Sequence, residues 1–144
     1  MQMDRSLTVA RMSAETSASA GLDDVWRWLI RCQTNPVRLE VDDLPALGRA
    51  ARLRLDLPLS APRAVLCALW LHDDVDAGGC LLVGQLRFVA HPTGSDLRLS
   101  FSGRTASALS SGLPGQLADD LARQLLDVIA ESIEPPPALN LRAV

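Results

Sequence analysis

The feature that most constrains the fold of this chain is a hydrophobic period of two in its middle part. Apolar residues alternate with charged residues, Ser or Pro over residues 37–41, 51–59 and 97–102. Such alternation marks strands with one dry face and one wet face, which is usual in antiparallel sheets. Two longer apolar runs, Arg63 to His72 and Cys80 to Ala90, are joined by a short segment rich in Asp and Gly, which predicts a hairpin.

A period of 3.6 replaces the period of two after Pro114. The apolar residues of this segment form one stripe, namely Leu117, Leu121, Leu125 and Val128, flanked by Ala118, Ala122, Ile129 and Ile133. About 20 residues at ~1.5 Å each give a helix of ~30 Å, long enough to lie across the dry face of the sheet. Pro135 to Pro137 end this helix, and the tail from Pro135 to Val144 is expected to be irregular.

The N-terminal part of the chain has weaker patterns. Residues Ser6 to Met12 alternate and predict a strand, and the small residues Ser13 to Gly21 are expected to form a connector. A short helix follows, and Asn35-Pro36 ends it, because the residue before a proline avoids the helical conformation. Its predicted buried face consists of Leu22, Val25, Trp26 and Leu29, and Trp28 is expected beside that face as a partly packed residue.

This order of elements predicts an α+β fold with about six antiparallel strands and the helices on one face of the sheet. The chain has 144 residues, 48% of them hydrophobic, which suits one compact domain over residues 1–144. Its fourteen cationic residues are all Arg and are outnumbered by seventeen acids, so we expect no nucleic-acid partner. No apolar run approaches the roughly 20 residues of a membrane span, and we expect a cytoplasmic protein.

Two local patterns carry a family resemblance. Asp24-Val25-Trp26-Arg27-Trp28-Leu29 follows the first predicted strand, and Gly84 to Phe88, Ser102-Gly103-Arg104 and the Leu-rich helix from Leu117 to Glu134 come later. Together these patterns resemble the START-like superfamily, also called SRPBCC or helix-grip proteins, and its actinobacterial members in particular. The resemblance implies a curved sheet wrapped around the long C-terminal helix, enclosing a cavity for lipids, polyketides or other apolar molecules.

The candidate site residues follow from that expected cavity. The inward positions of the alternating strands are apolar, so we expect a ligand site lined by Trp26, Leu53, Leu55, Leu86, Phe88, Leu99, Phe101, Leu121 and Leu125. We expect no catalytic residue, because His72 and His91 fall roughly 30 Å apart at opposite ends of one strand. We expect no metal and no cofactor either, since the acidic turn at Asp74 and Asp76 lacks the acidic twelfth residue of an EF-hand loop.

Three functions remain open at this point. The first is binding of an apolar small molecule without covalent chemistry, which would need a pocket lined by Leu and closed by Trp. The second is an enzyme of the polyketide cyclase or aromatase type, which would need an inward His or an Arg–acid pair. The third is a protein-interaction module with a filled core and an exposed apolar patch. The strand Arg63 to His72 is apolar on both faces, which is compatible with a homodimer.

Overall fold

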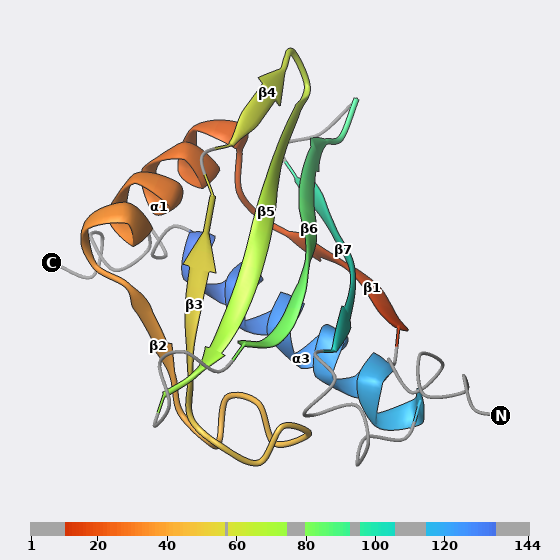
Figure 1. Cartoon of the computed structure of the whole chain (residues 1–144). Helices are drawn as coiled ribbons and strands as arrows, with labels where there is room; N and C mark the ends of the chain where they lie inside the picture. Colours follow the sequence, from red (N-terminus) through yellow and green to blue (C-terminus); the bar gives the residue numbers. More distant parts are fainter. Residues whose placement is uncertain (1–10, 57, 75–79, 93–95, 106–114, 135–144) are drawn as a thin grey trace, which may run out of the picture.

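The computed structural model describes residues 11–56, 58–74, 80–92, 96–105 and 115–134, and within them the chain forms one antiparallel sheet and two helices (Figure 1). The elements in chain order are β1 (Arg11–Ala18), α1 (Leu22–Thr34), β2 (Val37–Leu39), β3 (Ala51–Leu55), β4 (Leu59–Ala61), β5 (Ala64–Asp73), β6 (Cys80–Ala90), β7 (Leu97–Thr105) and α3 (Gly115–Ile133). The seven strands have the order β1-β7-β6-β5-β3-β2, with β4 paired to one end of β5. The predicted α+β fold is confirmed.

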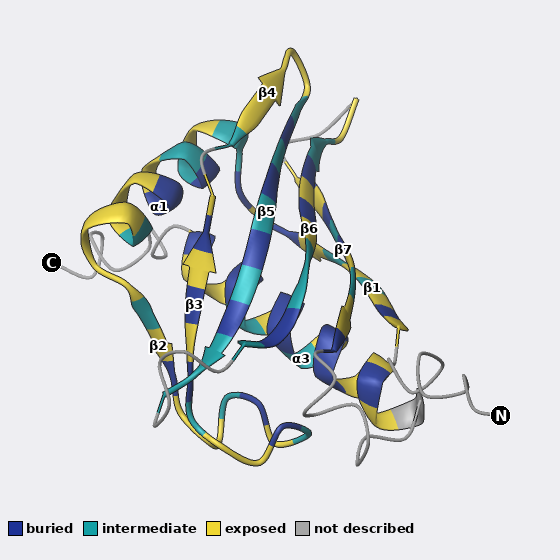
Figure 2. Cartoon of the chain, in the orientation of Figure 1, coloured by how far each residue is buried: buried dark blue, intermediate teal, exposed yellow. Residues whose placement is uncertain are grey.

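The long helix α3 crosses one face of the sheet, which we call the inner face (Figure 1). It packs mainly against β1 and β7, and α1 contacts β3, β6 and α3 from the same side. The alternating strands turn their large apolar side chains to this face and their arginines to the opposite face, which we call the outer face. Figure 2 shows the alternation along β5, where buried residues are separated by half-buried ones.

The first strand continues further along the chain than the sequence predicts, to Ala18 rather than Met12. Residues 6–10 lie outside the described residues, whereas β1 begins at Arg11 and includes most of the segment expected to be a connector. Its inner positions carry small side chains such as Ala14 and Ala18, which let α3 approach the sheet closely. The sequence pattern is weak because small residues give little hydrophobic contrast between the two faces.

Both helices are rotated relative to the predicted faces. On α1 the buried residues are Val25, Trp28 and Leu29, while Trp26 is half-buried, so the prediction of Trp28 as a partly packed residue is wrong. The Trp28 ring meets the Phe88 ring edge-on, with 6.3 Å between centroids. On α3 the buried stripe is Ala118, Leu121, Ala122, Leu125, Leu126, Ile129, Ala130 and Ile133. Leu117 is 37% exposed, because the stripe that faces the sheet starts one residue later than predicted.

Two predicted strands are shorter than their sequence alternation. The alternation over 51–59 ends as a strand at Leu55, and Leu59 lies in the separate strand β4 with 73% of its surface exposed. Pro58 explains the break, because proline has no N–H to donate to a neighbouring strand. The alternation over 37–41 gives only β2, and Val41 is exposed beyond it.

Candidate functional site

The predicted ligand residues lie in the core between the sheet and the helices. Trp26 is half-buried on α1, and the other eight are buried, namely Leu53, Leu55, Leu86, Phe88, Leu99, Phe101, Leu121 and Leu125. The register pairs Leu86 with Phe101 and Phe88 with Leu99 across β6 and β7. These side chains therefore pack on one another and on α3, and their role in binding a ligand stays a prediction.

A pair of glycines shows how tightly this face is packed. Gly84 on β6 and Gly103 on β7 are direct partners, and the Phe101 ring lies against both. A Cβ atom at position 84 would lie 2.4 Å from the Ser102 carbonyl oxygen and 2.7 Å from Cε1 of Phe101. Only glycine leaves room for the ring at these two positions. The Phe101 side chain, which was expected to line a cavity, is therefore packed directly against the backbone of both glycines.

The outer face is organised in rows that run across the strands. The register places Arg11 of β1, Arg104 of β7 and Val83 of β6 in one row. The next outer row consists of Ser13, Ser102 and Gln85, and the one after it of Glu15, Ser100, Arg87 and Leu66. The middle row therefore has serines on β1 and β7, whereas one flanking row has arginines on these two strands and the other has Glu15 on β1 and Arg87 on β6.

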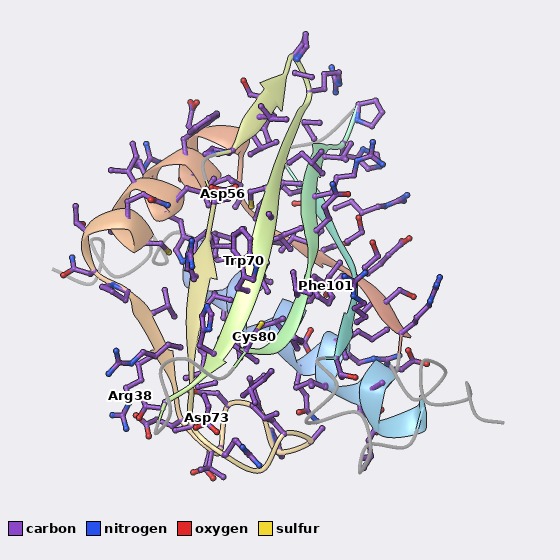
Figure 3. The ribbon with its side chains drawn as sticks, in the orientation of Figure 1. Arg38, Asp56, Trp70, Asp73, Cys80 and Phe101 are labelled. Carbon is purple, nitrogen blue, oxygen red and sulfur yellow. The ribbon has the colours of Figure 1, made fainter. Side chains whose placement is uncertain are left out.

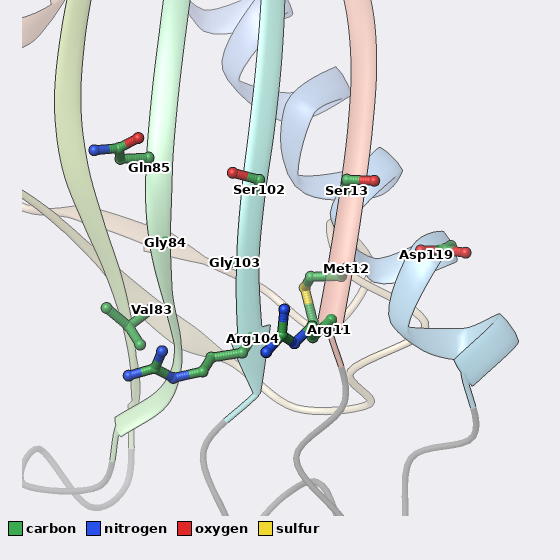
Figure 4. Close-up of a pocket in the computed structure, with 10 residues that line it drawn as sticks. All are labelled: Arg11, Met12, Ser13, Val83, Gly84, Gln85, Ser102, Gly103, Arg104 and Asp119. Atoms are coloured by element: carbon green, nitrogen blue, oxygen red, sulfur yellow. The ribbon is translucent and has the colours of Figure 1, made fainter. Parts of the chain in front are cut away.

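The two flanking rows form the walls of an open groove, which we call the outer-face trough. Its floor is Ser13, Ser102 and Gln85, shared by two pockets of about 600 and 400 Å³. Figure 4 shows the larger pocket, with the serines and Gln85 in one row and the two arginines below them. The walls stand four residues apart along the strands, which is about 13 Å at ~3.3 Å per residue.

Arginines give the outer face its charge. The side chains of Arg11, Arg87, Arg98 and Arg104 are exposed and form no ion pair with the residues that the structure describes. Arg54 is different, since its guanidinium lies over the Trp70 ring, 4.8 Å from the centroid, on the same face. The sequence places these cations far apart, and the register of the sheet brings them onto one surface.

The acidic turn after β5 is held by arginines. Asp74 accepts hydrogen bonds from Arg38 at 3.1 Å and from Arg52 at 3.0 Å, and these bonds hold the pKa of Asp74 below its ordinary value of 3.8. Asp73 pairs with Arg49 at 2.6 Å. Figure 3 shows Arg38 and Asp73 at this end of the sheet. These contacts favour a structural role for both carboxylates, while Asp76 lies outside the described residues.

A third pocket lies where α1 ends beside β3. It measures about 410 Å³ and is lined by Cys32, Gln33, Pro36, Arg52, Leu53, Arg54, Leu55 and His72. Burial raises the pKa of the Cys32 thiol to about 11, and that of the neighbouring Cys67 to about 12. Thiols with such pKa values stay protonated at neutral pH and are poor nucleophiles. The register also places His72 and His91 at opposite ends of the β5–β6 pair, as predicted.

The trough residues were only partly visible in the sequence. The sequence predicts Gln85 and Arg87 on one face of the strand Cys80 to Ala90, as either a polar rim or a solvated face, and it predicts Ser13 in a connector. The alternation of β7 assigns Ser102 and Arg104 to the outer face. The alternation does not predict the register that places Ser13, Ser102 and Gln85 side by side. The hydrophobic period shows which face a residue is on, but it does not show which residues of neighbouring strands are paired.

Comparisons with known proteins give weak similarities. No family model matches the chain, and no curated protein matches it. Among solved structures, hypothetical protein jhp0584 from Helicobacter pylori is 10% identical, with a TM-score of 0.48 over 85% of this chain and 87% of that one. DynU16, from the dynemicin biosynthetic locus, is 13% identical, with a TM-score of 0.41 over 85% of this chain and 45% of that one.

These similarities are too low to assign a function. The observed fold is consistent with the helix-grip architecture that the sequence resemblance implies, and membership of that superfamily is not shown. Within the described residues, no helix combines the length and the hydropathy required to cross a bilayer.

Proposed function

We propose that this domain is a non-enzymatic binding module that holds a segment of a partner protein in the outer-face trough. The observation that carries the proposal is the contrast between the two faces of the sheet. The inner face is packed around Phe101, whereas the outer face has an open groove with a floor of Ser13, Ser102 and Gln85.

The shape of the trough favours a partner segment over a small molecule. Small-molecule sites are concave and enclose most of the ligand surface. The trough is instead open, and all three floor residues are exposed. Ser and Gln side chains both donate and accept hydrogen bonds, which suits the alternating N–H and C=O groups of a peptide backbone.

Apolar residues extend the surface beyond the trough. Leu66 lines the smaller pocket, and its cross-strand partner Leu59 is largely exposed. Trp70 is half-buried two strands away from Arg104, in the same row. These accessible apolar side chains beside the polar floor could add apolar contact area to a bound partner segment.

The proposal can be tested by selecting peptides from a display library of 16-residue sequences on the immobilised protein. A Ser102→Trp variant fills the centre of the floor with a residue that suits an exposed strand. Ser17→Trp is the matched control, because Ser17 is also exposed on the outer face but lines neither trough pocket.

We expect a selected pool that binds the wild type and Ser17→Trp equally, and that loses at least about tenfold in affinity on Ser102→Trp, a change of about 1.4 kcal/mol. A selection that yields no pool dependent on Ser102 would contradict the proposal. Native mass spectrometry of the same samples shows whether the bound partner is a peptide or a second copy of the chain.

Binding of an apolar small molecule is a second candidate, supported by the pocket beside α1. Two of the predicted ligand residues, Leu53 and Leu55, line this pocket of about 410 Å³. A thermal-shift screen with fatty acids and flat polycyclic probes tests this candidate, because a ligand that prefers the native state raises the melting temperature. Absence of any shift across the screen counts against it.

The enzyme alternative receives less support from the described residues. Thr105 is the one polar side chain among them that is fully buried, and the arginines described above lie on the outer face. An inward His or Arg–acid pair is what a cyclase-type reaction would need, and the described part of the inner face has apolar residues at those positions.

A further inference from the structure

Two arginines face each other directly at one wall of the trough. Arg11 of β1 and Arg104 of β7 are cross-strand partners with both side chains exposed on the outer face. The Cβ atoms of directly opposite residues lie about 4.5–5.5 Å apart, and like charges at that separation destabilise a sheet. Figure 4 shows both side chains running across the sheet toward β6.

No carboxylate among the described residues compensates this pair through an ion pair. Two acidic residues line the trough pockets. Asp119 is on α3, on the other side of β1 from the two guanidinium groups in Figure 4, and Glu15 is on the opposite wall. Neither forms a salt bridge with Arg11 or Arg104. Among the described residues, no carboxylate therefore offsets the repulsion between the two cations, and a carboxylate that binds from outside would reduce it.

We propose that Arg11 and Arg104 together bind a carboxylate of an acidic peptide segment that lies in the trough. This inference rests on the proposed function, because it names the class of partner that the trough holds. A guanidinium is planar and presents paired N–H donors that match the two oxygens of a carboxylate. Two guanidinium groups on neighbouring strands can engage one carboxylate or two successive ones.

The β5 end of the trough indicates which type of residue the same peptide segment has beyond its acidic residue. Trp70 lies on β5 in the same row as Arg104 and two strands away from it, and two inter-strand spacings of ~4.8 Å make roughly 10 Å. An extended peptide covers that distance with about three residues at ~3.3 Å each. The expected segment therefore has an acidic residue and an apolar residue about three positions apart, with backbone groups over the Ser and Gln floor.

Charge favours an acidic peptide over a nucleic acid. The chain as a whole has a net charge of −3, and Glu15 stands on the second wall of the trough, where a phosphate backbone would be repelled. Binding of a nucleic acid draws on a continuous basic stripe that neutralises several phosphates. A peptide can place its acidic residue beside Arg11 and Arg104 and an apolar residue near Trp70 at the β5 end of the trough.

The test uses the display library and the Arg104→Gln variant. Arg98→Gln is the matched control, because Arg98 is exposed on the outer face of the same strand but has Ser17 as its partner on β1. We expect the pool selected on the wild type to be enriched in Asp and Glu three positions from an apolar residue. Its members should bind Arg104→Gln at least about tenfold more weakly and Arg98→Gln within about threefold, as expected for a lost charge-assisted hydrogen bond.

The outcomes separate this inference from the proposed function. A pool that depends on Ser102 but shows no acidic enrichment would overturn the inference and leave the proposed function standing. Equal weakening by Arg104→Gln and Arg98→Gln would also overturn it, since only overall charge would matter. Tighter binding of a single-stranded oligonucleotide than of the selected peptides would overturn the choice of partner class. Failure to select any Ser102-dependent pool removes both proposals.

Discussion

Replacing Gly84 with alanine tests whether the inner face of the sheet is filled. The Cβ atom that this substitution adds would lie 2.4 Å from the Ser102 carbonyl oxygen, and two atoms of the Phe101 ring would be 2.7 Å away. The ring can rotate, but the carbonyl oxygen belongs to the backbone of the neighbouring strand. The strands β6 and β7 must therefore move apart, or the inner layer must repack.

The cost follows from two opposing effects. Overpacking an interior costs about 1–3 kcal/mol, and a backbone clash belongs at the upper end of that range. Replacing glycine with alanine returns roughly 0.5–1 kcal/mol by reducing the entropy of the unfolded chain. We expect a net loss of about 2 kcal/mol in the free energy of unfolding, or about 7 °C in Tm for a chain of this length.

Urea denaturation followed by circular dichroism measures this difference, with Gly21→Ala as the control. A Cβ atom at position 21 would meet only Asp24 Oδ2 at 3.9 Å, so that variant should change the stability by less than about 1 kcal/mol. If Gly84→Ala proves as stable as the wild type, the inner face has free space beside Phe101, and the reasoning that this part of the core is filled is refuted.

Three further predictions concern the core, the thiols and the acidic turn. Leu125→Ala should cost about 2–5 kcal/mol in urea denaturation, and Leu117→Ala on the same helix less than about 1.5, because only Leu125 is fully buried; equal costs would show that the helical face is misassigned. Cys32 and Cys67 should resist iodoacetamide at pH 8 in the native state and react in urea, since burial raises both pKa values; mass spectrometry of the alkylated peptides decides. The lowered pKa of Asp74 stabilises the folded state at pH values above the unfolded-state pKa of 3.8, and this stabilisation is lost as the pH falls through the lower pKa of the folded state. Asp74→Asn should therefore make the free energy of unfolding depend less on pH in acid. An unchanged pH dependence would contradict the role of the arginine pairs.

The fold was predictable because its main signals are periodic. Alternation in the strands correctly assigns Leu53, Leu86 and Leu99 to the inner face, and the period of 3.6 correctly places a long helix on them. The errors concern residues whose burial depends on neighbouring elements. Trp28 is buried because α1 packs against Phe88 of β6, which no local pattern of α1 contains.

The candidate site was less predictable for a physical reason. A trough depends on which residues stand side by side on three strands, and a slip of one residue would move each side chain to the other face. Ser13, Ser102 and Gln85 are ordinary polar residues in the sequence, separated by up to 89 positions. Their alignment exists only in the paired sheet, so sequence reasoning identifies the polar face without identifying the groove in it.

The measurement that tests the central claim most directly is a two-dimensional ¹H–¹⁵N NMR titration of the labelled protein with a selected peptide. If the outer-face trough is the binding site, the largest amide shifts will lie at Ser13, Gln85, Ser102 and Arg104, and those of Leu121 and Leu125 on α3 will change little. Shifts concentrated on α3 and the inner-face strands, with the trough residues unchanged, would contradict the account.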